Sequence, residues 1–459
     1  MIQIPSPELI RKYDRPGPRY TSYPTAPEWT ELSAAQYEKH LARANAQGGP
    51  LSIYVHLPFC REMCRFCGCN VIATRDRSRP DAYLDVLEKE IALVAKHLPT
   101  RRGASQLHWG GGTPTFLDEA QLARCHELLA RTFEFTKDAE KAIEIDPAIT
   151  TKGQIQLLAK LGFNRISMGV QDFDEKVQQT VARIQSEKDT ADLVQAARDA
   201  GFGGVNLDLI YGLPFQTPET WKRTLDTIIR IRPDRMATFG FAYTPWLKPH
   251  QRLLPEGDLP KTELRVQLFL MAVEAFTSAG YRLIGLDHFA LETDELAKAQ
   301  DEGYLYRNFQ GYTIRPAEDT VAFGMTSISD IGGAYAQNMH RLKDWEAKVN
   351  AGELPVERGA AMTADDVMRR FVINRVMCLL RLDLREVAEK FGPAARKEIE
   401  ASLDRGVSEL KQDGLVTFDG DVLKVTPLGQ LLVRNVAMLF DAYLPKHAGE
   451  KKQTFSRTV

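Results

Sequence analysis

The sequence Tyr-Val-His-Leu-Pro-Phe-Cys-Arg-Glu-Met-Cys-Arg-Phe-Cys-Gly-Cys-Asn occupies residues 54–70 and decides the fold. It contains four of the six cysteines of a 459-residue chain. Cys60, Cys64 and Cys67 form the spacing C-x3-C-x2-C, a compact set of soft thiolate ligands suited to an iron–sulfur cluster or to zinc. Three protein ligands on a four-iron cluster leave one iron open to a small molecule.

The ligand set has competing interpretations. A zinc knuckle would take Cys69 or His56 as its fourth ligand and would only stabilise a loop. We interpret Cys69 as a neighbour of the cluster and not as a ligand. The C-x-C spacing places Cys67 and Cys69 too close together for both to bind one cubane easily. Tyr54 and His56 alternate along a strand and therefore share one face. A hydrogen-bonded core histidine is the competing interpretation for His56.

The composition of the chain indicates its cellular compartment and limits the kinds of partner it can have. Four clustered thiols and two distant ones make no disulfide framework, which indicates a reducing compartment. No apolar stretch approaches the roughly 20 residues that span a bilayer, and the first residues lack a signal pattern. Lys plus Arg number 59 and Asp plus Glu number 61, which gives no case for nucleic acid or membrane. We expect a cytoplasmic monomer.

Short apolar, β-branched runs alternate with helical patterns, as in repeated βα units. The helical patterns include residues 81–94, 150–161 and 187–200, and the last two end near a glycine that can cap the helix. The predicted strands are Leu51–His56, Gln106–Trp109, Lys141–Ile145, Arg165–Val170, Gly204–Ile210 and Met236–Ala242.

A parallel βα series places its functional groups beyond the C-terminal ends of its strands. The cysteines follow the first strand, Gly110–Thr113 the second, Asp146 the third and Gln171 the fourth, and Asp208 lies within the fifth. Six units are too few to close an eight-fold barrel. The sequence therefore predicts an α/β fold with an open three-quarter (βα)6 barrel.

The βα rhythm ends near residue 250, where proline, glycine and charge become more frequent. We expect an N-terminal arm covering the active site (1–48), the barrel (49–250), an α+β extension closing the barrel (251–359) and a mostly helical domain (360–459). Residues 410–429 predict a helix end, a hairpin with an Asp-Gly-Asp turn and another helix, a winged-helix-like pattern. Mixed charges there favour packing over DNA binding.

Three features at strand ends indicate ligand binding. The glycines 110–112 allow a close backbone approach to a ligand, or only a tight turn. Glu144 lies in Ala-Ile-Glu-Ile-Asp-Pro, where a carboxylate needs a cationic partner. That partner is either a ligand or a structural ion pair with Arg165 or Arg183. Asp208 has the same two interpretations, and its carboxylate suits adenosine hydroxyls.

Residues 17–25, Gly-Pro-Arg-Tyr-Thr-Ser-Tyr-Pro-Thr, are too stiff and aromatic for a disordered arm. Arg19, Tyr20 and Tyr23 suit a flat apolar ring that bears carboxylates, because a guanidinium binds the acid and aromatic faces stack on the ring. A plain strap packed on the barrel is the alternative interpretation.

Several motifs together resemble the oxygen-independent coproporphyrinogen III oxidases (coproporphyrinogen III dehydrogenases) of the radical S-adenosylmethionine (SAM) superfamily. The resemblance covers nearly the whole chain. Gly112-Thr113 stands where many radical SAM enzymes have a GGE-like glutamate, a departure that fits one branch of the superfamily. The motifs are Pro18–Pro24, Tyr54–Asn70, His108–Thr115, Ser167–Phe173, Asp208–Pro214, Asp287–Ala290 and Arg307–Thr313.

The resemblance implies a six-unit radical SAM barrel with an N-terminal segment and a helical C-terminal domain that closes the cleft. It implies oxidative decarboxylation of two propionates of coproporphyrinogen III to the vinyl groups of protoporphyrinogen IX, in haem biosynthesis. A 5′-deoxyadenosyl radical takes a hydrogen from the propionate β-carbon, carbon dioxide leaves, and a final acceptor removes one electron. An electron donor such as flavodoxin or ferredoxin is implied as well.

The resemblance also implies one 4Fe–4S cluster on Cys60, Cys64 and Cys67, with Cys69 as an extra, non-ligating thiol, and two SAM molecules. The residues predicted to act in catalysis are Tyr54, Cys69 and Glu144. The predicted contacts of the first SAM are Tyr54, Gly111, Glu144 and Ile328. Those of the second are Phe66, Gly112, Thr113, Gln171, Arg183, Asp208 and Ala242.

Two rival functions are weighed against this prediction. A haem chaperone related by descent keeps the barrel and the cluster but binds and transfers haem. Such chaperones typically lack both the arm motif and a cysteine at position 69, and this chain has both. The second rival is a binding module in which a metal has only a structural role. That interpretation leaves the triple glycine and Gln171 unexplained.

Overall fold

The computed structural model describes residues 5–314, 319–447, 455 and 457–458, so part of the N-terminal segment judged above for a signal pattern lies outside it. The chain forms two compact units. The barrel unit comprises residues 30–261 and 315–361, and the helical unit comprises residues 1–29, 262–314 and 362–459. The four-part division remains a prediction, and both units cut across its boundaries.

The barrel unit is built on six strands that are hydrogen-bonded in sequence order, each parallel to the next. All six predicted strands are confirmed, with shifted ends. The largest difference is at the third strand, which begins at Glu134 instead of Lys141. The strands are β2 (Leu51–Leu57), β5 (Gly103–Gly111), β6 (Glu134–Ile145), β7 (Arg165–Gln171), β8 (Gly204–Tyr211) and β9 (Arg235–Gly240).

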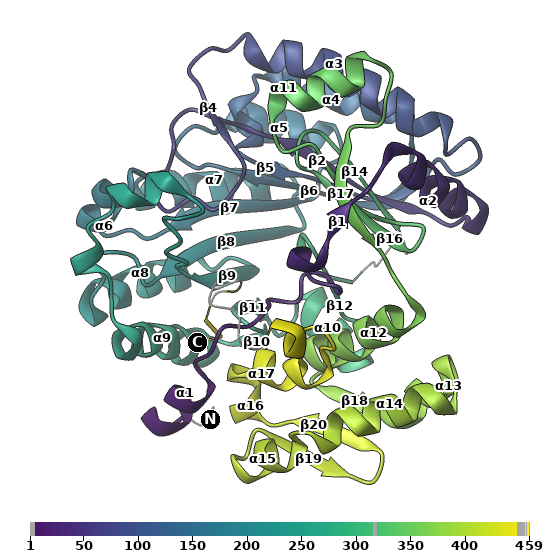
Figure 1. The fold of residues 1–459 in the computed structure, drawn as a ribbon. Coiled ribbons are helices and arrows are strands. Elements are labelled where there is room, and N and C mark those ends of the chain that lie inside the picture. The colour runs from purple at the N-terminus through teal and green to yellow at the C-terminus, as the bar shows by residue number, and fades with distance from the viewer. Residues whose placement is uncertain (1–4, 315–318, 448–454, 456, 459) are drawn as a thin grey trace. The chain divides into compact units, whose positions relative to one another are not determined.

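Helices connect these strands, and all of them except the short helix Glu175–Val181 lie side by side in chain order (Figure 1). Sequential parallel strands require right-handed crossovers, which place all the connecting helices on the same side. Capping boxes at Asp118, Thr151 and Thr217 fix three of the helix starts. The helices are α3 (Arg79–Lys96), α4 (Glu119–Ala130), α5 (Lys152–Lys160), α6 (Glu175–Val181), α7 (Glu187–Asp199) and α8 (Pro218–Ile231).

Residues 319–361 extend the same sheet beyond β2, which the sequence did not predict. β14 (Asp319–Phe323) pairs in parallel with β2, and the next strands are antiparallel. These are β15 (Ile328–Ile331), β16 (Ala334–Asn338), β17 (Val356–Ala361) and β1 (Thr30–Glu31), with the helices α2 (Ala34–Gln47) and α11 (Leu342–Asn350). The extension covers the edge that β2 would otherwise expose.

A buried carboxylate joins this extension to helix α3. Glu90 is 1% exposed and accepts hydrogen bonds from the backbone N–H of Gly324, from Asn338 and from the indole of Trp345, at 2.8, 2.5 and 3.1 Å. Burial raises its pKa to about 7, although these three donors act in the opposite direction. The folded protein therefore holds a proton on Glu90 at pH values where the unfolded chain has released it.

We expect Glu90→Gln to reduce the pH dependence of stability. The wild-type free energy of unfolding should fall by about 1 kcal/mol per pH unit more than that of the variant as the pH rises from 5 to 7, because only the wild type must deprotonate a buried group. Urea unfolding at several pH values measures the difference. Glu88→Gln, an exposed change on the same helix, is the control. Equal slopes for wild type and Glu90→Gln would contradict the assignment.

The helical unit is organised around a separate hydrophobic cluster. The hairpin predicted near residue 420 is confirmed, with Asp419 paired to Val422. The main elements are α1 (Pro7–Tyr13), α9 (Thr262–Ser278), β10 (Tyr281–Gly285), β11 (His288–Leu291), α10 (Glu295–Glu302), β12 (Tyr306–Asn308), β13 (Gly311–Thr313), α12 (Ala364–Leu379), β18 (Arg381–Asp383), α13 (Leu384–Phe391), α14 (Pro393–Asp404), α15 (Val407–Gln412), β19 (Val416–Asp419), β20 (Val422–Val425), α16 (Pro427–Leu431) and α17 (Val433–Ala437).

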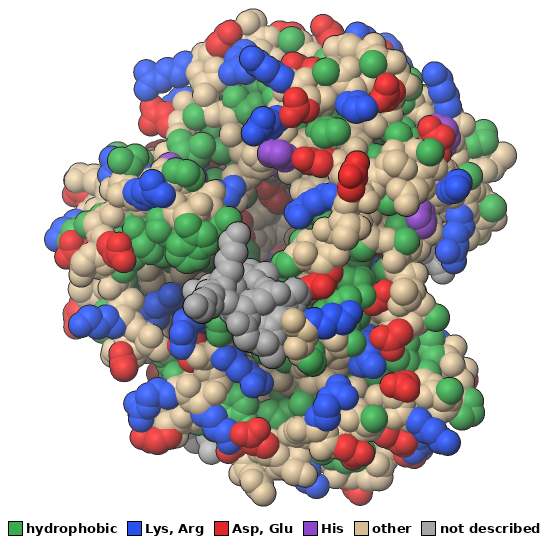
Figure 2. Space-filling model, viewed as in Figure 1, with side chains coloured by type: hydrophobic (Ala, Val, Ile, Leu, Met, Phe, Trp, Pro, Cys, Tyr) green, Lys and Arg blue, Asp and Glu red, His purple; other side chains and the backbone are tan. Residues whose placement is uncertain are grey.

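Charged side chains of both signs are interspersed over the face drawn in Figure 2, in keeping with a formal net charge of −2. Among the helices that the structure describes, none combines the length and the apolar composition that crossing a bilayer requires.

Candidate active site

A cavity of about 450 Å³ lies in the barrel unit, at the C-terminal ends of strands β2 and β5 to β8. This is the end of a parallel sheet at which the sequence predicted the site. The residues of functional interest that line it are Cys60, Cys64, Phe66, Cys67, Cys69, Gly111, Gly112, Thr113, Glu144, Asp146, Ser167, Gly169, Gln171, Arg183 and Asp208.

The cysteines lie on a loop between β2 and β4 (Ile72–Ala73), with β3 (Phe59–Cys60) pairing with β4 at its base. Side chains of the segment 248–251 hold this loop by its backbone. Lys248 donates to the carbonyl of Cys69 at 3.0 Å, and Gln251 donates to the carbonyl of Phe66 at 3.1 Å. His250 Nε2 lies 2.8 Å from the carbonyl oxygen of Cys67. The thiols are thus left to line the cavity.

The thiols of Cys60, Cys64 and Cys67 all line this cavity, as the ligands of one cluster would. Cys60 Sγ lies 3.4 Å from Thr113 Oγ1, and an Arg183 guanidinium nitrogen lies 3.9 Å from Cys64 Sγ. Burial raises the pKa of Cys60 to about 11, so ligand binding there would displace a proton. In the part of the chain that the structure describes, no three His, Cys, Asp or Glu side chains converge to hold one metal ion. A 4Fe–4S cubane does not need ligands that converge on one ion, because each thiolate binds a different iron of the cluster.

His56 is a buried, hydrogen-bonded histidine. Its Nε2 lies 2.9 Å from the carbonyl oxygen of Asn70, so Nε2 carries the proton and donates it. Nδ1 is then an acceptor, and the Tyr54 hydroxyl donates to it at 3.1 Å. Burial lowers the pKa of His56, which keeps the ring neutral. Both nitrogens are therefore engaged, which argues against His56 as a zinc ligand.

The triple glycine is required by the site's own packing. A Cβ at Gly110 would lie 2.8 Å from a Glu144 carboxylate oxygen, and one at Gly111 would lie 2.5 Å from the His56 ring. A Cβ at Gly112 would lie 2.6 Å from the Pro58 backbone. Gly111 also has a φ of +108°, a conformation that other residues rarely adopt. These glycines let Glu144, His56 and the cysteine loop approach strand β5.

We expect Gly111→Ala to destabilise the barrel by about 2–4 kcal/mol, which combines backbone strain with overpacking against His56. Gly103→Ala, at the other end of the same strand, is the control, because a Cβ there meets nothing within 4 Å. Thermal unfolding followed by circular dichroism compares the two variants. A Gly111→Ala protein as stable as Gly103→Ala would refute this packing argument.

Glu144 faces the cavity, and its partners are His108 and a backbone N–H. His108 Nε2 lies 3.0 Å from one carboxylate oxygen, and the backbone N–H of Gly111 donates to the other at 3.3 Å. Burial raises the pKa of Glu144, but these hydrogen bonds lower it more, so the group is ionised at neutral pH. The Tyr54 ring stacks on His108 at 5.8 Å. Arg183 is not the partner of Glu144, because it pairs with Asp146 at 2.9 Å.

Asp208 is the second carboxylate in the cavity. Asn206 and Ser167 donate to it at 2.7 and 3.0 Å. Burial and the negative charge of Glu144 raise the pKa of Asp208 to about 7. At neutral pH it can therefore both donate to and accept from a ligand hydroxyl.

Arg183 spans the gap between the cysteine loop and the strand ends. It donates to the carbonyl of Gly169 at 2.7 Å besides pairing with Asp146, and its Nε is buried without a hydrogen-bond partner. An unpaired buried donor beside a cavity is a favourable place for a polar ligand atom. Gln171, at the end of β7, has a φ of +69°, and such strain is common at functional positions.

Three predicted cofactor contacts do not line this cavity: Tyr54, Ala242 and Ile328. Tyr54 stacks on His108, and His108 in turn contacts Glu144. Ala242 lies in the loop after β9, where its carbonyl accepts from Gln251, and Ile328 is on β15. Conversely, the predicted site residues did not include His108, Ser167 and Asn206, which contact Glu144 or Asp208. Asn206 lies two residues before Asp208 on β8, so strand alternation could have identified it.

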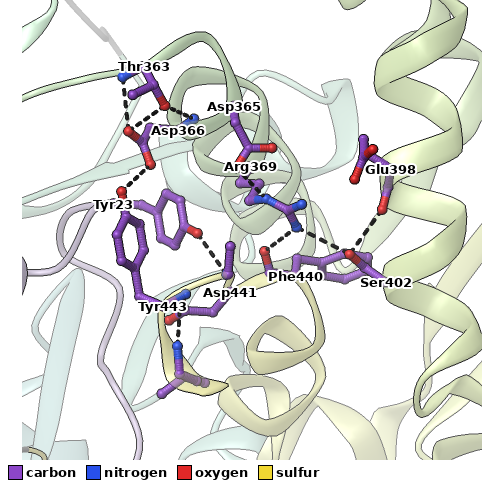
Figure 3. A network of polar contacts seen from close by, with 12 residues as sticks. Tyr23, Thr363, Asp365, Asp366, Arg369, Glu398, Ser402, Phe440, Asp441 and Tyr443 are labelled. Carbon is purple, nitrogen blue, oxygen red and sulfur yellow. Dashed lines mark hydrogen bonds and ion pairs between the residues drawn. The ribbon is translucent and has the colours of Figure 1, made fainter. Parts of the chain in front are cut away.

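The N-terminal motif belongs to the helical unit, where two of its aromatic residues are buried. Tyr20 is 7% and Tyr23 1% exposed, and Tyr20 donates to Asp441 at 3.0 Å. Tyr23 accepts from the backbone N–H of Ala442 at 2.9 Å, and its ring lies beside that of Tyr443 (Figure 3). Arg19 keeps 34% of its side chain exposed. Substrate contact by these three residues remains a prediction, and the two tyrosines serve as anchors in this unit.

The sequence was compared with known proteins. The family model of the Radical SAM superfamily matches residues 54–228, and that of the HemN C-terminal domain matches residues 362–432. The oxygen-independent coproporphyrinogen III oxidase of Salmonella typhimurium is 45% identical over 452 residues, which cover 98% of both chains. The chain belongs to the oxygen-independent coproporphyrinogen III oxidase family. The Helicobacter pylori member of this family is 41% identical over 459 residues, covering 98% of this chain and 99% of the relative.

A solved structure supports the same family. The Escherichia coli protein described as "Coproporphyrinogen III oxidase (HemN)" and as a radical SAM enzyme matches with a TM-score of 0.91 and 42% identity, over 96% of this chain and all of that one. The predicted fold class, a radical SAM barrel with appended segments, is thereby confirmed. As a member of the oxygen-independent coproporphyrinogen III oxidase family, the chain is a radical SAM enzyme, which implies a 4Fe–4S cluster and SAM.

Proposed function

We propose that this chain converts coproporphyrinogen III to protoporphyrinogen IX without oxygen, by oxidative decarboxylation of two propionate side chains, in haem biosynthesis. The observation that carries the proposal is the cavity that joins the C-x3-C-x2-C thiols to Glu144 and Asp208 at the ends of parallel strands. Relatives named for this reaction, at 40–45% identity over nearly the whole chain, support it.

Cys60, Cys64 and Cys67 are the proposed cluster ligands. When bound, the reduced cluster and SAM supply a radical able to remove a hydrogen atom from a propionate. The protein's part is to hold the ligands and to exclude water. Lys248, His250 and Gln251 fix the backbone of the cysteine loop. The Thr113 hydroxyl and Arg183 hold polar atoms near the sulfurs of Cys60 and Cys64, respectively.

Glu144 is the proposed contact for a cationic ammonium group of SAM. The carboxylate is ionised, and within the described residues no lysine or arginine pairs with it, since its partners are His108 and a backbone N–H. Asp208 is the proposed contact for ribose hydroxyls, because a carboxyl with a pKa near neutrality can donate and accept. Gly111 and Glu144 are proposed for the first SAM together with Tyr54 and Ile328.

A second SAM molecule is proposed on Phe66, Gly112, Thr113, Gln171, Arg183, Asp208 and Ala242. All of these except Ala242 line the same cavity as Glu144. We expect equilibrium dialysis of the reconstituted holoenzyme with labelled SAM to reach two equivalents per chain at saturation, because the residues proposed for the second molecule line the cavity beside those proposed for the first. Saturation at one equivalent would contradict the second site and leave the first intact.

Three further properties are proposed: a flavodoxin or ferredoxin as electron donor, from the family resemblance, and a cytoplasmic location and a monomeric state, from the sequence. The free cysteines support the second of these, because free thiols persist in a reducing compartment.

The test of function is anaerobic incubation of the reconstituted protein with reductant, SAM and coproporphyrinogen III, followed by chromatography. We expect a monovinyl intermediate and then protoporphyrinogen IX. A haem chaperone would instead bind haem stoichiometrically and leave coproporphyrinogen III unchanged, so one incubation separates the enzyme from its rival.

A further inference from the structure

Arg183 contacts the cysteine loop and the ends of two strands at the same time. Its Nη1 lies 3.9 Å from Cys64 Sγ and 2.9 Å from Asp146 Oδ2, and its Nη2 donates to the carbonyl of Gly169 at 2.7 Å. Nη1 carries two hydrogens, so one can point to the carboxylate and the other to the sulfur. A positive charge is therefore held against one of the three thiols proposed to bind the cluster.

The surroundings of this guanidinium fix its position. The side chain of Arg183 is 12% exposed and that of Asp146 is 15% exposed, so the solution screens their ion pair only weakly. Arg183 follows Ala182, which ends helix α6 in the left-handed conformation with a φ of +55°. A Cβ at Gly169 would lie 3.0 Å from Arg183 Nη2, so the glycine makes room for the guanidinium.

A cation in this place affects the reduction of a cluster. Proteins adjust the reduction potential of an iron–sulfur cluster through nearby charge, hydrogen bonds to the sulfurs and exposure to solvent. The reduced cluster carries one more negative charge than the oxidised one, so a cation beside a ligating sulfur stabilises it more. Partial burial strengthens this effect, because the effective dielectric constant is lower than that of water. Asp146 offsets part of the positive charge while it holds the guanidinium in place.

We infer that Arg183 raises the reduction potential of the cluster held by Cys60, Cys64 and Cys67, with Asp146 as a positioning residue. The inference rests on the cluster ligands of the proposed function. It assigns a role to the contact between Arg183 and Cys64, which the predicted contact of Arg183 with the second SAM does not explain. A cluster of higher potential accepts an electron more readily from a given donor.

The test is the midpoint potential of the cluster in the reconstituted holoenzyme. An anaerobic titration with mediator dyes, without SAM, is followed by electron paramagnetic resonance of the reduced cluster. We expect Arg183→Gln to lower the ratio of reduced to oxidised cluster at a fixed solution potential about 10- to 100-fold, the effect of losing a charged hydrogen bond. That change is about 60 to 120 mV for one electron. Arg183→Lys keeps the charge and should lower the potential less.

Two further variants separate the effect of charge from a change in structure. The double variant Arg183→Gln, Asp146→Asn leaves no buried carboxylate unpaired. Its potential should lie between those of Arg183→Gln and the wild type, because the sulfur loses its charged donor while a negative charge is removed as well. Arg75→Gln removes an arginine that is 81% exposed and pairs with Glu62 at 2.6 Å, and it should leave the potential unchanged.

Three results would overturn the inference. The first is a wild-type potential in Arg183→Gln, or in the double variant where Arg183→Gln alone loses its iron. The second is a potential in the double variant as low as that of Arg183→Gln, which would indicate entry of solvent instead of loss of charge. The third is a potential in Arg183→Lys as low as that of Arg183→Gln. Failure of the proposed function would show instead as a wild-type protein that binds no cluster or forms no product.

Discussion

Replacing Cys64 by alanine is expected to abolish both the iron–sulfur absorption and the enzymatic activity of the reconstituted protein. Cys64 lies on the loop with Cys60 and Cys67, and these three thiols share one wall of the cavity. Two remaining thiolates cannot hold a cubane that needs three protein ligands and an open iron. Iron and sulfide content, with the electron paramagnetic resonance spectrum of the reduced protein, measure the loss.

Cys69→Ala is the matched control, because Cys69 is the fourth thiol of the same loop. Its backbone carbonyl is held by Lys248, which the substitution leaves in place. We expect a full complement of iron with reduced turnover, since Cys69 is predicted to act in catalysis without binding the cluster. Loss of iron in Cys69→Ala with retention in Cys64→Ala would show that the ligands are assigned wrongly.

Glu144→Gln is expected to weaken SAM binding to the reconstituted enzyme about 10- to 100-fold, because a charge-assisted hydrogen bond to an ammonium group becomes a neutral one. The substitution keeps the shape of the side chain and its acceptor toward Gly111. The affinity is measured by equilibrium dialysis, and activity at saturating SAM shows how much function remains.

Glu134→Gln controls for the loss of a negative charge, since Glu134 is exposed at the opposite end of the same strand. Its SAM affinity should equal that of the wild type. If Glu144→Gln also binds SAM normally, the carboxylate has only a structural role toward His108. That result would remove Glu144 from the proposed cofactor contacts.

The barrel was predictable because its signals are local. Each parallel strand is a short apolar run, and each helix has its own cap, such as the Thr151 capping box of α5 and the left-handed Gly162 after it. Residues 319–361 were not predictable in the same way. Their short strands acquire their role only by pairing with β2, a contact between segments far apart in the sequence.

The candidate site also has features that the sequence could predict and others that it could not. The cysteine spacing was recognisable from the sequence, whereas each carboxylate on a strand was predicted either to contact a ligand or to form a structural ion pair. The pairing of Arg183 with Asp146, and of Glu144 with His108, depends on which strands are neighbours and in which register. The reason for the three glycines could not be read from the sequence either, since it lies in the side chains of Glu144 and His56 and in the Pro58 backbone that approach them.

The most direct test of the central claim is whether product formation requires SAM. The reconstituted, reduced protein is incubated anaerobically with coproporphyrinogen III and an electron acceptor, with SAM and without it, and protoporphyrinogen IX, 5′-deoxyadenosine and carbon dioxide are quantified. The account predicts two molecules of carbon dioxide and two of 5′-deoxyadenosine for each protoporphyrinogen IX, and no product without SAM. Unchanged coproporphyrinogen III in the complete mixture, from protein with a full cluster, would contradict it.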